Sequence, residues 1–140
     1  MKKKVPVKVS LKTTMEQDDQ QETFQFEEDG EFIVLNDKYY LRYLEHQNGQ
    51  ATPVQFRLDD EEVHIRRQGT TETWLVFDQE QPTITRYRTE YGVMQLRVVT
   101  SQLDKDLDPV TPAGRLSLHY RLQADGQEIG SYQIELHFAA

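Results

Sequence analysis

The alternation of apolar and polar residues constrains the fold of this chain more than any other feature. Residues 5–11 place an apolar side chain at every second position, and residues 116–122 and 132–138 repeat the pattern near the C-terminus. Successive side chains of a β-strand point to opposite faces, so a period of two predicts strands with one buried and one solvated face. We therefore expect an all-β protein with little helix.

Turn residues divide the chain into about eight to ten strands. The clearest turn signals are Asn36-Asp37, Asn48-Gly49, residues 59–62, Tyr91-Gly92 and Asp125-Gly126. Short turns without crossover helices are typical of an antiparallel meander. Strands in hairpin order can close on themselves and remove their exposed edges, so we predict a single antiparallel β-barrel domain over residues 1–140.

One hairpin can be predicted down to its register. Residues 83–89 and residues 93–100 both alternate, and their inward sets face each other when Arg88 pairs with Val93. This pairing leaves residues 89–92 as the loop, which is a common hairpin length.

Two segments interrupt the alternation. Gly30 divides residues 23–28 from the apolar residues 32–35, which indicates a turn or a β-bulge. Residues 101–113 are acidic and contain two prolines, so we predict that they form the longest connection. The apolar spacing within residues 103–107 indicates one helical turn there.

The composition excludes several chemistries. The chain has no cysteine, so it carries no disulfide, thiolate metal site, iron–sulfur cluster or cysteine nucleophile. Its formal net charge is -8, and residues 16–31 contain eight acidic residues and no basic one. Because an acidic body repels phosphate backbones, we do not expect nucleic acid as a partner.

The sequence contains no targeting or catalytic signature. The lysines at residues 2–4 precede an alternating strand instead of a continuous apolar stretch, and no segment is long and apolar enough to be a membrane-spanning helix. No hydrolase, metalloprotease, phosphate-loop or dinucleotide-binding motif is present. We therefore expect a cytoplasmic protein without a cofactor or contact with a membrane, and not an enzyme.

A pair of charged residues lies on the apolar side of the predicted strands. Glu45 and Arg67 share their faces with apolar neighbours, and a buried charge requires a partner. One interpretation is a polar anchor for a small, partly apolar ligand inside the barrel, with Tyr39, Tyr43 and Tyr87 as aromatic walls. The other is a structural ion pair, in which case Arg67→Ala costs about 3 kcal/mol of stability.

The outer face carries a second candidate surface. Arg86, Arg88 and Arg97 form a basic stripe on one hairpin, and Trp74 points outward if Leu75 and its alternate neighbours point inward. The stripe is either a solvated face or a docking surface for an acidic partner or for RNA, although no aromatic stacking platform lies between these arginines. An exposed Trp74 indicates a protein or homodimer contact, unless the parity of its strand is reversed.

Two histidines near the C-terminus suggest a metal site at first sight. His119 and His137 share the outward parity of two strands, with Glu135 beside them. A short loop at Asp125-Gly126 places His119 opposite one of residues 133–137. His119 therefore faces His137 directly only if it pairs with the last residue of this range. We predict no metal site there, because two histidines without a fixed third ligand form a weak pattern.

The chain resembles the YwiB-like proteins of Gram-positive bacteria along nearly its whole length. The residues that carry the resemblance are Tyr40-Leu41-x-Tyr43-x-Glu45, Val63-x-Ile65-x-Arg67-x-Gly69, Thr83-Ile84-x-x-Tyr87, Tyr91-Gly92, Leu96, Thr100 and Gly114-Arg115-Leu116-x-Leu118-x-Tyr120. The resemblance implies a calycin-type barrel, similar in shape to lipocalins, with room for an interior pocket. It implies no catalytic residue and no particular ligand. A filled barrel that acts as a protein-interaction module is the alternative function.

Overall fold

The computed structural model describes residues 2–47, 49–69, 72–89 and 91–140, with the side chains of residues 2, 47 and 87–89 excepted. These residues form ten strands and no helix, and so no helix able to cross a membrane is found among them. The strands are β1 (Lys2–Gln17), β2 (Gln20–Leu35), β3 (Lys38–Gln47), β4 (Gln50–Leu58), β5 (Glu62–Gln68), β6 (Glu72–Asp78), β7 (Thr83–Thr89), β8 (Gly92–Asp108), β9 (Ala113–Ala124) and β10 (Gln127–Ala139).

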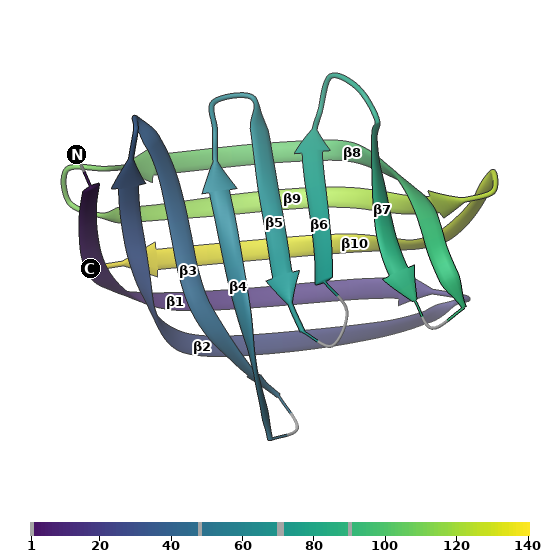
Figure 1. Cartoon of the computed structure of the whole chain (residues 1–140), viewed down its shortest axis with the longest axis horizontal. Coiled ribbons are helices and arrows are strands. Elements are labelled where there is room, and N and C mark those ends of the chain that lie inside the picture. Colours follow the sequence, from purple (N-terminus) through teal and green to yellow (C-terminus); the bar gives the residue numbers. More distant parts are fainter. Residues whose placement is uncertain (1, 48, 70–71, 90) are drawn as a thin grey trace.

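All ten strands belong to one sheet, in the order β6-β5-β4-β3-β2-β1-β10-β9-β8-β7. Each pair of neighbours is antiparallel, and the pairing of β1 with β10 joins the two ends of the chain. Figure 1 shows β1, β2 and β8–β10 along the long axis of the molecule, with β3–β7 crossing over them as a second layer. The prediction of an all-β, antiparallel barrel is confirmed, and the barrel is nearly closed.

Apolar side chains from both layers fill the interior. The predicted inward sets on β1, β9 and β10 are buried or partly buried, and the buried residues of β3 and β5 also follow the alternation. The largest fully buried side chains are Phe32, Phe56, Phe77, Leu11, Ile33, Leu41, Leu116, Leu118 and Leu136. Because burying one such side chain contributes about 1.5–3 kcal/mol, this core is the main source of stability.

Gly30 is neither a turn nor a bulge, so that expectation is wrong. β2 passes through Gly30 without a change of register, and the glycine pairs with Val7 on one side and Tyr43 on the other. A Cβ atom at Gly30 would lie 2.7 Å from the carbonyl oxygen of Arg42 and 2.8 Å from Cγ2 of Val9. The glycine is required by the close approach of neighbouring strands instead of by a bend.

The predicted connection at residues 101–113 is also largely wrong, because β8 continues to Asp108. A bulge between Thr100 and Gln102 shifts the pairing with β9 by one residue. Inward residues are therefore even-numbered before the bulge and odd-numbered after it, where Leu103 and Leu107 pack against the core. Leu103 and Leu107 are four residues apart, a spacing that fits one face of a strand as well as one turn of a helix, and the predicted helical turn is strand in the structure.

The predicted register of the β7–β8 hairpin is confirmed. Arg88 pairs with Val93 and Thr85 with Leu96. The loop is shorter than expected, because Thr89 also pairs with Gly92.

The barrel closes differently at the two edges of the sheet, β6 and β7. No backbone register joins these two strands over the described residues. Instead, the hydroxyl of Thr83 donates to the carbonyl of Val76, and the hydroxyl of Thr85 donates to the carbonyl of Trp74. We call this boundary the seam. The seam is closed by hydrogen bonds from side chains, whereas the other neighbouring strands are joined by backbone hydrogen bonds.

Candidate functional site

The structure brings the two predicted interior charges together. Glu45 lies on β3 and Arg67 on β5, and β4 between them pairs with both strands. Nη1 of Arg67 donates to Oε1 of Glu45 at 2.6 Å, and the hydroxyl of Tyr43 donates to Oε2 at 3.4 Å. The three residues form one polar cluster at the edge of the core.

Burial and charge both shift the pKa values of side chains within this cluster. The Glu45 side chain is 6% exposed and that of Arg67 is 36% exposed. Burial raises the pKa of Tyr43 well above its usual value, and the neighbouring Glu45 carboxylate raises it further. Burial alone would lower the pKa of Arg67, but the charge of Glu45 and its hydrogen bond raise it. The cluster is therefore a charged, satisfied ion pair beside a neutral phenol.

Of the other two predicted aromatic walls, Tyr39 does not join the cluster. Tyr39 stacks on Phe32, with ring centroids 5.8 Å apart, and lies six residues before Glu45 on the same strand. At a rise of about 3.3 Å per residue, this separation removes Tyr39 from the polar cluster. The side chain of Tyr87 lies outside the described residues.

Sequence reasoning did not place the buried Tyr120 near Arg67. Burial raises the pKa of Tyr120, and the charge of Arg67 lowers this pKa by a smaller amount. Its ring lies 4.6 Å from that of Phe77 and 5.0 Å from that of Tyr132. The inward parity of β9 predicted its burial, but only the closed barrel places it near β5.

The outer face on both sides of the seam carries exposed apolar and basic side chains. Trp74 on β6 is 49% exposed, Ile84 on β7 is 54% exposed and Val93 on β8 is 64% exposed. Arg86 and Arg97 are exposed on the same face, where Ile84 pairs with Arg97. We call these five residues the seam surface. Trp74, which was predicted to point outward, and the basic stripe thus lie on one surface. The side chain of Arg88, the third arginine of the stripe, lies outside the described part.

The ring of Trp74 is held in place by β5. Its Nε1 donates to Nδ1 of His64 at 3.1 Å, and the guanidinium of Arg66 lies 5.7 Å from the ring centroid. Nε of Arg66 also donates to Glu72 at 2.8 Å. A cation–π contact and a hydrogen bond reduce the rotamers open to an exposed ring, so Trp74 presents a fixed apolar face to solvent.

The two C-terminal histidines do not face each other. His119 pairs with Gln133, and His137 pairs with Arg115. The pairing of Leu118 with Ile134 fixes this register, as the short loop after β9 predicted.

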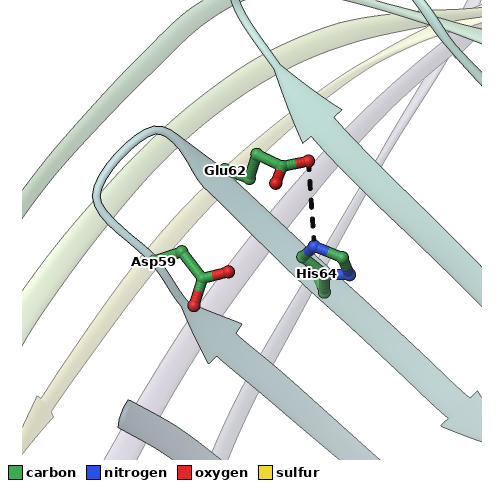
Figure 2. A group of neighbouring side chains, drawn as sticks. All are labelled: Asp59, Glu62 and His64. Carbon is green, nitrogen blue, oxygen red and sulfur yellow. Dashed lines mark ion pairs between the residues drawn. The ribbon is translucent and has the colours of Figure 1, made fainter. Parts of the chain in front are cut away.

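A cluster of potential metal ligands lies elsewhere, at the turn between β4 and β5. Figure 2 shows Asp59 at the turn, with Glu62 and His64 beside it. Glu62 begins β5, His64 follows two residues later, and the potential ligand atoms of the three residues lie within 4.8 Å of one another. From the sequence, residues 59–62 were identified only as a turn. The pairing of Leu58 with Val63 gathers the three residues, and a tight hairpin after residue 58 was the signal that could have found them.

Neighbouring donors argue against a metal ion in this cluster. Nη2 of Arg57 lies 2.8 Å from the Asp59 carboxylate and 3.0 Å from Nε2 of His64. Trp74 and Arg57 each present an N–H donor to a ring nitrogen of His64, and a neutral imidazole can accept from only one of them, so a cation would add a further positive charge beside Arg57. Burial and Arg57 lower the pKa of His64. We interpret the cluster as an ion-pair network that supports Trp74.

Taken together, these features define a small, nearly closed ten-stranded β-barrel protein with a packed interior and one basic and aromatic outer surface. Residues 9–136 match a family described as a domain of unknown function, DUF1934, and the chain belongs to that family. It is 29% identical over 138 residues to "Uncharacterized beta-barrel protein YwiB" of Bacillus subtilis (strain 168), covering 98% of this chain and 92% of that protein.

The crystal structure of the YwiB protein from Bacillus subtilis has the same fold. It superposes with a TM-score of 0.82 at 23% sequence identity, over 98% of this chain and 92% of that chain. The resemblance inferred from the sequence motifs is confirmed at the level of family and fold.

Proposed function

We propose that this protein is an interaction module that binds an acidic protein partner through the seam surface. The observation that carries the proposal is that Arg86 and Arg97 make no ion pair with any described residue, although the protein has 24 acidic residues. Interfaces favour arginine beside exposed aromatic residues, and Trp74 lies across the seam.

The charge of the whole protein narrows the partner. A formal net charge of -8 opposes binding to a phosphate backbone, and one exposed tryptophan is not a stacking platform for successive bases. A symmetric contact with a second copy through this surface would bring two basic patches together, which costs free energy. A partner with carboxylates and apolar side chains complements both the basic and the apolar residues of the seam surface.

A small ligand inside the barrel is the second candidate function. It is favoured by two buried hydroxyls, those of Thr13 and Thr100, which have no hydrogen-bond partner in the described structure. Buried hydroxyls usually have a partner, so a polar ligand or a water molecule at these atoms would satisfy them. The packed core and the satisfied Arg67–Glu45 pair leave less support for this candidate than for the outer surface.

Affinity capture with matched charge variants tests the proposed function. We expect the protein to retain acidic proteins from a bacterial extract, and we expect the double variant Arg86→Glu with Arg97→Glu to lose them. The control, Lys3→Glu with Lys12→Glu, changes the net charge equally at exposed positions away from the seam. Equal capture by both variants contradicts the proposal, and nuclease-sensitive capture assigns the surface to nucleic acid instead.

A further inference from the structure

The strands on either side of the seam are sheet edges that have no backbone ladder between them over the described residues. β6 and β7 are seven residues each, and neither contains lysine or proline, the residues that usually protect an edge from pairing. Their sequences, ETWLVFD and TITRYRT, are rich in β-branched and aromatic residues. Both strands therefore suit an additional partner strand.

The bonds across the seam are of a kind that a backbone can replace. The carbonyls of Trp74 and Val76 point toward β7 and accept hydroxyl protons from Thr85 and Thr83. In a complete sheet the same carbonyls would accept amide protons from a neighbouring strand. When a backbone amide of the partner replaces a threonine hydroxyl, the β6 carbonyl exchanges one donor for another, so the number of hydrogen bonds that β6 accepts is unchanged.

We propose that an extended, acidic segment of a partner protein adds a strand at the seam and pairs with the edge of β6. This inference rests on the proposed function and specifies how that partner binds. Backbone bonds to the carbonyls of Trp74 and Val76 provide affinity, and alternate side chains provide specificity. The outward side chains of the added strand lie beside Arg86 on β7, with Arg97 one strand further away on β8, so we expect acidic residues there and apolar residues between them.

The first part of the test selects the segment. A phage-displayed library of random peptides of about twelve residues, long enough to span a seven-residue edge, is selected on the wild-type protein. We expect proline-free sequences in which acidic and apolar residues alternate. Methylation of alternate backbone nitrogens in a selected peptide should weaken its binding by at least about tenfold, because it removes the donors to β6. Failure to enrich such peptides overturns the inference.

The second part closes the seam covalently. Because the chain has no cysteine, Val76→Cys with Ile84→Cys introduces two unique thiols on the outward faces of β6 and β7. Joining them with a short bismaleimide should weaken peptide binding by at least about tenfold relative to the same variant capped with N-ethylmaleimide, and the loss in the capped variant relative to the wild type measures what Ile84 itself contributes as part of the seam surface. The opposite change, Thr83→Val with Thr85→Val, frees the two carbonyls and should strengthen binding.

The outcomes separate this inference from the proposed function. If the closed seam binds the peptide normally while Arg86→Glu with Arg97→Glu abolishes binding, the partner docks on the surface without adding a strand. The inference then fails and the proposed function stands. If neither the closed seam nor the charge reversal affects binding, both are overturned.

Discussion

The Arg67 guanidinium and the Glu45 carboxylate meet inside the barrel, with Nη1 2.6 Å from Oε1. The glutamate is almost fully enclosed, whereas the arginine remains 36% exposed, so the two partners do not depend on each other equally. Loss of the arginine leaves a buried carboxylate without its counter-charge. Loss of the glutamate leaves an arginine that water can still reach.

Arg67→Ala should therefore lower the free energy of unfolding by about 2 kcal/mol, somewhat less than for a fully buried pair, because water can enter beside the partly exposed site. Urea denaturation measures the change. Replacing both charges, Arg67→Met with Glu45→Leu, should recover much of the loss, because no unpaired charge remains. An equal loss in the single and the double variant would assign the effect to packing instead of charge.

The stability of the fold should depend on pH through His64. Burial and Arg57 lower the pKa of this side chain from its ordinary value of 6.5, so the unfolded chain binds a proton more readily than the folded one. The contribution of His64 is complete above about pH 6.5 and decreases as the pH falls below it. In urea titrations from about pH 8 to 5, His64→Gln should reduce this decrease. His137→Gln, at an exposed position, should retain the wild-type slope.

The alternation of residues was sufficient to predict which side chains face inward on most strands. It placed Glu45 with Leu41 and Tyr43 on β3, and Arg67 with Ile65 on β5, and all five lie on the inner face. Parity along a strand is a local property, so no knowledge of the partner strands was required. The meeting of Glu45 and Arg67 was predicted because a buried charge requires a partner.

Features that depend on the pairing of distant strands could not be predicted in the same way. The bulge near Thr100 changes the parity of β8, and only the register with β9 reveals the extra residue. Gly30 looked like a bend because the sequence does not show how closely Arg42 and Val9 approach it. The seam could not be located either, because any two neighbouring strands of a meander could form the boundary.

Trp74 should report the electrostatic character of the seam surface. It is the only tryptophan of the chain, its side chain is half exposed, and the Arg66 guanidinium lies 5.7 Å from its ring centroid. A positive local potential attracts anions, so iodide should quench its fluorescence more strongly than caesium does. Arg66→Gln should reduce this difference, and added salt should screen it. Equal quenching by the two ions would contradict a basic surface at Trp74.

Gly30→Ala should destabilise the barrel although alanine normally suits a strand better than glycine. The added methyl group would overlap the Arg42 carbonyl, which belongs to the backbone of β3 and cannot rotate away. We expect a loss of about 1–3 kcal/mol in urea denaturation, as for overpacked cores. Glu27→Ala, at an exposed position of the same strand, should change stability by less than about 0.5 kcal/mol.

Removing the hydroxyls that close the seam should weaken the fold where its backbone ladder is interrupted. Thr83→Val with Thr85→Val keeps the volume of both side chains but leaves the carbonyls of Val76 and Trp74 without these donors. Each lost hydrogen bond should cost about 1 kcal/mol in urea denaturation, and amide exchange should increase selectively in β6 and β7. Thr23→Val on β2, at an exposed position, is the control for the chemical change alone. An unchanged exchange rate in β6 and β7 would mean that core packing, and not the two threonine hydroxyls, holds the seam closed.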